Sequence, residues 1–238
     1  MSTFSDELTA EVRTTVRLPW THRDGLVVPE NTAVGLGNDR VELDAVLLYA
    51  DLADSTELAI RDQQIASEVF KSYLRGVTKI IKANGGDVRS FDGDRVMGVF
   101  IGDSKNSQAA KSGLQINWFF RYAVETEFRA YYGAAIGDVV FNQTVGIDQS
   151  RIFVARAGVR IENDLIWVGR APNIAAKLSA VREPNYNTLI TADVYGKLSD
   201  SSKFSPTDGT DMWTQLNWAA GNPYGIPKVY GSSWWVKA

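Results

Sequence analysis

The order in which strand-like and helix-like apolar patterns follow one another constrains the fold of this chain most. A nearly continuous apolar run, Leu43 to Ala50, predicts a strand buried on both faces. Apolar residues then recur every three or four positions between Ile65 and Ile80, which predicts a helix, and the glycine pair after Asn84 is typical of a helix end. The pattern therefore begins as a β-α unit.

Two short strand-like runs, residues 88–91 and 96–101, follow this helix. They are joined around Asp92-Gly93, a pair that is typical of a tight turn between antiparallel strands. We therefore expect a β-hairpin here.

A second helix is predicted over residues 104–128, followed by strands over 131–136 and 139–145. The order β-α-β-β-α-β predicts an α+β fold of the ferredoxin-like, split-βαβ type. Beyond it, two further strands and a helix are predicted over residues 152–159, 164–168 and 172–181.

The regions that flank this pattern differ from it. Residues 1 to about 40 are interrupted by prolines and glycines, which predicts an N-terminal surface arm with a short helix near Ser5 to Arg13. We expect residues 41–238 to form the main domain, including a C-terminal extension. Its C-terminal part holds four of the seven tryptophans, which predicts a β extension that covers the core or forms a dimer surface, at Trp213, Trp218, Trp234 and Trp235.

The composition excludes several classes of function. The formal net charge is -3, which disfavours a nucleic-acid-binding role, and we expect no nucleic-acid partner. The chain has no cysteine and one histidine, His22, so disulfides, thiol nucleophiles and sites built from Cys or several His residues are excluded. A signal peptide and a membrane-spanning run are both missing from the sequence, so we expect a cytoplasmic protein without direct membrane insertion.

Asp51 stands at the carboxyl end of the first predicted strand, followed by a polar turn that opens a helix. The free backbone N–H groups from Leu52 to Thr56 could bind phosphates there. The alternative is that Asp54 or Ser55 serves only as an ordinary helix N-cap.

The hairpin turn places Asp94 at the rim of the same sheet, where it could converge with Asp51. Two close carboxylates repel each other, and a divalent cation relieves that repulsion, so the pair would suit Mg²⁺ or Mn²⁺ completed by substrate phosphates. The alternative is a hairpin turn in which Asp94 is solvated.

A third segment, Gly169 to Lys177, opens a helix at Pro172 and carries Asn173 and Lys177 four residues apart. An amide and a cation on one helix face can position a sugar and neutralise a phosphoryl transition state. The alternative is a solvent-facing helix with no such role.

Together the three segments resemble class III nucleotide cyclases, over roughly residues 43–191. The resemblance rests on Tyr49-x-Asp51-Leu52-x-x-Ser55-Thr56, on the spacing from Gly85-Gly86 to Gly93-Asp94, and on Gly169-x-x-Pro172-Asn173-x-Ala175-Ala176-Lys177.

This resemblance implies a head-to-tail homodimer with two composite sites at its interface. Asp51 and Asp94, with the Leu52 carbonyl, would hold two Mg²⁺ or Mn²⁺ ions per site. Asn173 and Lys177 of the other subunit would contact the ribose and the transition-state charge.

The family usually has arginine at the position of Lys177, and lysine lacks the bidentate fork of arginine. The resemblance therefore leaves two expectations open: catalysis is weaker, or Arg170 assists.

The base pocket departs from the family pattern. At the two positions where purine cyclases read the base, this chain has Ser90 and Ile166, so adenine and guanine are both poorly explained. The segments around Tyr49 and Arg89 resemble the bacterial pyrimidine cyclases of the Pycsar antiphage defence system. In that branch Tyr49 would shorten the pocket, and Arg89 or Ser90 would reach a carbonyl oxygen of the base; the alternative for Tyr49 is a packed core aromatic.

The resemblance thus implies a uridylate cyclase that converts UTP to cyclic UMP and diphosphate, a second messenger that a separate cyclic-nucleotide-binding effector would read. Ala53, Asp54, Ser55 and Thr56 would complete the nucleotide contacts. Three alternatives remain open: a cytidylate cyclase acting on CTP, an adenylate cyclase, and a non-catalytic nucleotide-binding dimer.

Overall fold

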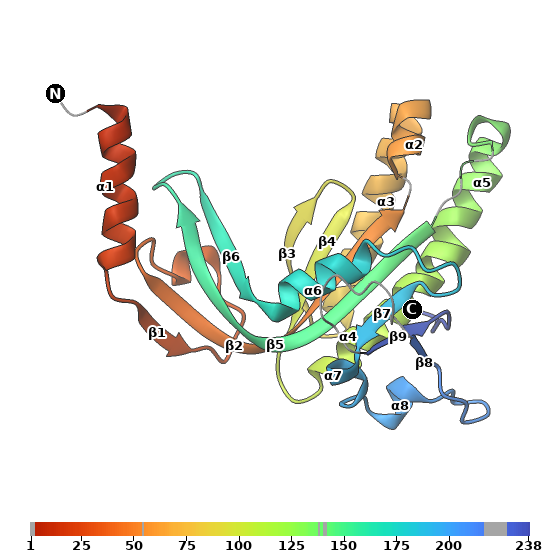
Figure 1. Ribbon diagram of the computed structural model, residues 1–238. Helices are drawn as coiled ribbons and strands as arrows, with labels where there is room; N and C mark the ends of the chain where they lie inside the picture. The colour runs from red at the N-terminus through yellow and green to blue at the C-terminus, as the bar shows by residue number, and fades with distance from the viewer. Residues whose placement is uncertain (1–2, 54, 138, 140–141, 217–227) are drawn as a thin grey trace. The chain divides into compact units, whose positions relative to one another are not determined.

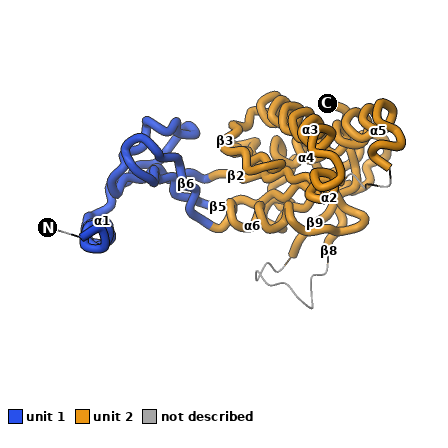
Figure 2. Tube along the Cα trace, turned by 90° about the horizontal axis from the view of Figure 1, so that it is seen from above, with its two compact units in different colours: residues 1–44, 151–169 blue, residues 45–150, 170–238 orange. Residues whose placement is uncertain are grey.

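The computed structural model describes residues 3–53, 55–137, 139, 142–216 and 228–238 (Figure 1). The chain divides into two compact units, which Figure 2 colours separately. Unit 1 combines Met1–Asp44 with Arg151–Gly169, and unit 2 combines Ala45–Ser150 with Arg170–Ala238. Two long strands, β2 (Asp39–Ala53) and β5 (Asn142–Gly158), contribute to both units.

Unit 2 holds the elements of the expected split-βαβ core. Its helices are α2 (Ser55–Arg61), α3 (Gln63–Ala83), α4 (Lys105–Phe119), the π-helical η2 (Phe120–Glu125), α5 (Thr126–Tyr132), the 3-10 helix η3 (Gly133–Ala135), α6 (Arg170–Ser179), α7 (Ala192–Tyr195) and α8 (Asp200–Lys203). Its other strands are β3 (Asp87–Asp92), β4 (Arg95–Phe100), β7 (Thr188–Thr191), β8 (Thr214–Leu216) and β9 (Val229–Ser232).

The strands of the sheet follow the order β3-β4-β2-β5-β7-β9-β8. The hairpin strands β3 and β4 are antiparallel, and β4 pairs with β2, so the hairpin lies beside the first strand of the core. The predicted α+β class and split-βαβ order are confirmed. At the other end, β8 and β9 extend the sheet beyond β7 as the expected C-terminal β extension.

Helix α3 shows why the sequence folds this way locally. The Asp62 side chain caps its N-terminus by accepting from the backbone N–H groups of Gln64 and Ile65, both at 2.9 Å. The apolar residues at helical spacing that predicted it are buried against the sheet. The helix ends at Ala83, with Asn84 as its C-cap and Gly85 following with a φ of 80°.

The two faces of the unit 2 sheet pack against different helices. Alternate residues of β2, such as Leu48 and Ala50, join the main core with α3 and α4. The residues between them, including Tyr49 and Asp51, point to the opposite face because side chains alternate along a strand. That second face also carries α6, which comes so close to β5 that a Cβ at Gly146 would lie 2.2 Å from the Ala175 carbonyl oxygen.

The predicted strand over residues 131–136 is wrong, because the second helix continues through η2 and α5 to Tyr132. Phe120 and Val124 are buried at helical spacing, and Phe128 and Tyr132 pack on the same core, so tertiary packing overrides the strand preference of the aromatic residues. Residues 142–145 and 152–158 of the predicted strands 139–145 and 152–159 belong to the single strand β5, Val139 and Val159 lie outside it, and residues 140–141 are not among the described residues.

Unit 1 contains α1 (Phe4–Arg17), β1 (Thr21–Asp24), the 3-10 helix η1 (Asn31–Ala33) and β6 (Asn163–Gly169). Helix α1 begins after Thr3 rather than Ser5, because the Thr3 side chain caps it in a capping box with Asp6. Strand β1 pairs with the start of β2, and β6 pairs with the end of β5. Residues 1–44 thus associate with 151–169, and Val28 and Val34 are buried.

No helix among the described residues is both long enough and apolar enough to cross a membrane.

Candidate active site

A cavity of about 480 Å³ lies in unit 2 at the carboxyl end of β2. Its lining residues come from β2, the start of α2, the hairpin turn and the segment after α6: Asp51, Leu52, Ser55, Thr56, Glu57, Asp94, Arg95 and Arg182. The cavity thus brings together both carboxylates that the sequence predicts as metal ligands.

The register of the sheet places the two carboxylates. Asp51 of β2 lies opposite Arg95 of β4, and Asp94 immediately precedes Arg95. The turn before it depends on Gly93, whose φ of 61° is in the left-handed region that glycine adopts without strain. The tight Asp-Gly turn therefore fixes where Asp94 meets the end of β2.

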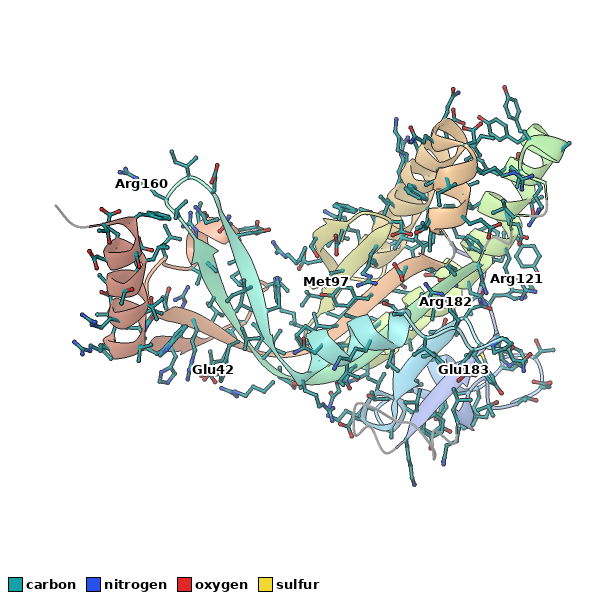
Figure 3. All side chains as sticks on the ribbon, turned by 45° about the horizontal axis from the view of Figure 1, so that its top comes forward. Glu42, Met97, Arg121, Arg160, Arg182 and Glu183 are labelled. Atoms are coloured by element: carbon teal, nitrogen blue, oxygen red, sulfur yellow. The ribbon has the colours of Figure 1, made fainter. Side chains whose placement is uncertain are left out.

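Two arginines hold the buried Asp51 carboxylate, which is 6% exposed. Arg95 donates through Nε to Oδ1 at 3.3 Å and through Nη2 to Oδ2 at 3.4 Å. Arg182 donates through Nη2 to Oδ2 at 3.3 Å. Its other nitrogen, Nη1, donates to the carbonyl of Ser179 at the end of α6 at 2.7 Å, and Figure 3 labels Arg182 just beyond that helix.

Asp94 differs from Asp51 because its Oδ2 atom is buried and accepts no hydrogen bond from any described residue. Tyr73 of α3 lies fully buried near the pair, and burial, with the charges of Asp51 and Asp94, raises the pKa of its hydroxyl well above the usual value. An uncompensated buried carboxylate oxygen in a polar cavity is the kind of atom that a cation completes.

No cluster of three or more Asp, Glu, His or Cys residues that could hold a metal occurs among the described residues. The two carboxylates could thus provide only part of a coordination shell. Hard cations such as Mg²⁺ commonly bind one or two carboxylates and take their other ligands from water and substrate phosphates, so the residues present fit such an ion together with a triphosphate.

The residues predicted for base recognition form a row across the sheet. Met97 of β4 pairs with Tyr49 of β2 on one side and with Ser90 of β3 on the other. The Tyr49 hydroxyl donates to the Met97 sulfur at 2.9 Å, and burial raises the pKa of Tyr49. The register of β3 shifts between Val88 and Ser90, which places Arg89 at a β-bulge.

Asn173 and Lys177 are both exposed on α6, while Ile174 and Leu178 pack the helix onto the sheet. Neither Asn173 nor Lys177 is among the residues that line the cavity of the same chain. The structure confirms that they share one exposed helix face, and it does not bring them to Asp51.

Arg170, which was predicted as one of two alternatives to assist Lys177 in catalysis, is held at the start of α6 by several hydrogen bonds. Its Nη2 donates to Asp148 Oδ1 at 3.2 Å and to the Gln149 carbonyl at 2.8 Å, and it also contacts Asp193. Burial raises the pKa of Asp148, whose Oδ1 also accepts from the Thr191 hydroxyl at 2.6 Å. These contacts fix the start of the helix that carries Asn173.

The remaining predicted residues have separate locations. Ala53 is buried at the end of β2, next to Ser55 and Thr56 at the start of α2. Asp54 and Trp218 lie outside the described residues. Ile166 belongs to unit 1, where it is exposed on β6 opposite Ala155.

Sequence reasoning missed Arg95 and Arg182. Arg95 follows Asp94 directly and pairs with Asp51, so the hairpin register could have revealed it. Arg182 stands 131 positions from the aspartate that it contacts, and no local pattern marks it.

Comparison with known proteins gives two kinds of similarity, although no protein-family model matches the chain. The chain is 36% identical to a uridylate cyclase of Rhodovulum sp. (strain MB263), covering 98% of this chain and 97% of that one. It is 37% identical to a uridylate cyclase of Xanthomonas perforans, covering 96% of each. The crystal structure of the adenylyl cyclase CyaB from P. aeruginosa shares the fold, with a TM-score of 0.68 and 20% identity over 84% of this chain and 96% of that one.

Proposed function

The chain belongs to the uridylate cyclase family, and we propose that it converts UTP into 3′,5′-cyclic UMP and diphosphate. The observation that carries this proposal is the similarity to uridylate cyclases over nearly the whole length of both chains. The cavity that contains Asp51 and Asp94 supplies a place for the reaction, at the end of a strand in a fold shared with an adenylyl cyclase.

In the proposed reaction, the ribose 3′-oxygen forms a bond to the α-phosphorus of the same nucleotide. The bond from the α-phosphorus to the oxygen that bridges it to the β-phosphorus breaks, and diphosphate leaves with that oxygen and its electron pair. The 3′-hydroxyl loses its proton as the new bond forms. Negative charge therefore accumulates on the phosphates, and the protein must stabilise it.

We propose that Asp51, Asp94 and the Leu52 carbonyl hold two Mg²⁺ or Mn²⁺ ions with the substrate. When bound, these ions would lower the pKa of the 3′-hydroxyl and neutralise the triphosphate. The buried Oδ2 of Asp94, which accepts no hydrogen bond from the described residues, supports this role. Ser55 and Thr56 line the same cavity and are proposed to contact the phosphates, with Ala53 and Asp54 beside them in the sequence.

We propose that Asn173 positions the ribose and that Lys177 neutralises the transition-state charge in the site of a second subunit. Their exposure on α6 and their absence from the lining of the cavity in their own chain support a composite site in a homodimer. Arg170 then acts by anchoring α6 rather than by touching the substrate.

The composite arrangement is tested by mixing two inactive variants, Asp51→Asn and Lys177→Ala. A mixed dimer holds one site with both wild-type halves, so partial activity is expected to return. No recovery, in a mixture shown by mass to contain the mixed dimer, would mean that each chain carries a complete site.

For the base, we propose that Tyr49 and Ser90, which share one row of the sheet, face the pyrimidine together with Arg89. Ile166, which stands where purine cyclases carry a polar reader, contributes no hydrogen bond that would select a purine. The two pyrimidines differ at one exchange, an O4 acceptor in uracil against an N4 donor in cytosine.

The substrate is tested by incubating the purified protein with UTP, CTP, ATP and GTP separately, with Mn²⁺, and identifying products by mass spectrometry. Cyclic UMP from UTP at the highest kcat/KM is the expected result. A preference for CTP or ATP would replace the substrate while keeping the fold. Binding of nucleotides without any product would favour a non-catalytic nucleotide-binding dimer.

We further propose that the cyclic nucleotide acts as a second messenger in antiphage defence, read by a separate effector that binds it. The resemblance to pyrimidine cyclases of such systems supports this role. Infected cells that carry the wild-type gene should accumulate cyclic UMP and survive as a culture, whereas the Asp51→Asn variant should do neither.

A further inference from the structure

Helix α1 is capped by hydrogen bonds at both ends, but none of its described side chains is buried in a hydrophobic core. The Thr3 capping box closes its N-terminus, and the Asn38 side-chain amide donates to the carbonyls of Thr15 and Leu18 at 2.8 and 2.7 Å at its C-terminus. In the part of the chain that the structure describes, no residue of α1 is buried. A helix of 14 residues is marginal in water by itself, so its stability calls for a packing partner.

The apolar residues of α1 form one ridge. Phe4, Leu8, Val12 and Val16 recur at every fourth position, and they are 73%, 47%, 65% and 78% exposed. Residues four apart are neighbours on one helix face, so these side chains make a continuous apolar ridge along the helix. An exposed apolar ridge of this kind marks an interaction surface.

The spacing of the apolar residues along the ridge is the same from the N-terminal end as from the C-terminal end. Its four members are placed symmetrically about position 10, so that in an antiparallel pair Phe4 would lie beside Val16 of the other helix, and Leu8 beside Val12. An interface between two copies related by a two-fold axis requires such self-complementarity. Two identical ridges of residues four apart also pack into each other's grooves, at a crossing angle of about −50°.

The charges of α1 favour the same orientation. Asp6 and Glu7 lie in its N-terminal half, Arg13 and Arg17 lie in its C-terminal half, and Glu11 lies just past its midpoint. An antiparallel pair places the acidic half of one helix beside the basic half of the other, whereas a parallel pair would place like charges together. Helices that lie on membranes are instead rich in Lys and Arg on their polar face, which α1 is not.

We propose that α1 is a self-association element, in which the ridge of Phe4, Leu8, Val12 and Val16 packs antiparallel against the same ridge of a second copy of the chain. Two helices of about four turns bury less than the roughly 1,200 Å² of a standard stable interface, so the pairing strengthens another contact between the copies. The inference does not depend on which nucleotide the site accepts.

The first test compares two variants that add the same charge on opposite faces. With about 100° per residue, Leu8 lies on the ridge and Ala10 on the opposite face. By sedimentation equilibrium of the full chain, Leu8→Glu should weaken self-association at least tenfold, whether the change is from dimer to monomer or from tetramer to dimer. Ala10→Glu should stay within threefold of the wild type.

The second test uses the absence of cysteine from the chain. A short bis-maleimide linker should join two copies of the Val12→Cys variant and should leave the Ala10→Cys variant uncrosslinked. Equal crosslinking of both variants would overturn the proposal.

Three other outcomes would also overturn it: equal association of the Leu8→Glu and Ala10→Glu variants, a wild-type chain that stays monomeric at all concentrations, or binding to phosphatidylcholine–phosphatidylglycerol vesicles that Leu8→Glu abolishes.

Discussion

Two of the four carboxylates of strand β2, Glu42 in unit 1 and Asp51 in unit 2, are each held by two arginines, but in different ways. Glu42 accepts from Arg151 through Nε at 2.8 Å and through Nη2 at 2.7 Å, and Arg40 lies 3.0 Å from its other oxygen. The contacts of Asp51 are all longer, between 3.3 and 3.4 Å.

The difference separates a structural ion pair from a site that can exchange its partners. Both contacts of Arg151 reach the same Glu42 oxygen, Oε2, and their lengths are those of charge-assisted hydrogen bonds. Asp51, with its longer contacts, lines a cavity beside Asp94, whose Oδ2 accepts no hydrogen bond from the residues that the structure describes. Under the proposed function, Arg95 and Arg182 would release Asp51 to the metal ions and would contact the phosphates of the substrate.

The largest effect is expected from Asp51→Asn, which removes one of the two charges proposed to hold the metal ions. Cyclic UMP formation should fall more than about 100-fold. The stabilisation that Mn²⁺ with UTP gives in a thermal melt should also disappear. Glu57→Gln changes an exposed carboxylate that lines the same cavity and serves as control, because its activity should stay near the wild type. Retained turnover in Asp51→Asn would contradict the metal assignment.

A second effect, on stability rather than on activity, is expected from Glu42→Gln. The hydrogen bond from Arg151 lowers the pKa of Glu42 below its ordinary value of 4.5. A carboxyl with a lowered folded-state pKa stabilises the fold above its unfolded pKa, and this contribution is lost as the pH falls through the folded value.

Melting temperatures measured between pH 7 and pH 3.5 check this expectation. The Glu42→Gln variant should melt several degrees below the wild type at pH 7, and the difference should shrink in acid, while kcat changes little. A pH-independent difference would show that the arginine contact is not its source.

A smaller effect is expected from Arg182→Gln, which removes one cation from Asp51. The affinity for Mn²⁺ without nucleotide should rise about three- to tenfold because the ion no longer competes with that positive charge. The KM for UTP should rise as well, because a cation near the phosphates is lost. Arg182→Lys keeps the charge, so its Mn²⁺ affinity, measured by calorimetry, should resemble the wild type. An unchanged affinity in Arg182→Gln would mean that Arg182 does not compete with the ion.

The smallest effect is expected from Tyr73→Phe. The Tyr73 hydroxyl is buried without a hydrogen-bond partner among the described residues, and the ring packs edge-on against Phe120 with centroids 6.1 Å apart. Removing an unsatisfied hydroxyl while keeping the ring should leave the melting temperature equal or slightly higher. A tenfold loss of Mn²⁺ affinity would instead place this hydroxyl in the hydration shell of the metal.

The parts of the fold that local signals determine could be predicted from the sequence. The Asp92-Gly93 pair indicated the hairpin, and the buried run that ends at Asp51 indicated the strand, so the convergence of Asp51 and Asp94 followed from the split-βαβ order. That Asn173 and Lys177 share one helix face followed from their spacing of four.

The features that could not be predicted from the sequence depend on contacts between residues far apart in the chain. Tyr131 and Tyr132 favour strands by propensity, yet the helix continues through both because Tyr132 packs on the core. Arg182 and Arg151 reach their carboxylates across more than a hundred positions, and such pairs leave no local pattern.

Unit 1 is assembled from two separate pieces of the chain, and this has a consequence for its biosynthesis. Residues 1–44 leave the ribosome before their partners, residues 151–169, which follow only after all of 45–150 has been made. At ordinary rates of translation this delay is on the order of 10 s. During that interval residues 1–44 lack their partner, the hairpin formed by β6 and the end of β5. The apolar ridge of α1 is already outside the ribosome. A chaperone or a neighbouring nascent copy on the same polysome could bind the ridge in this period.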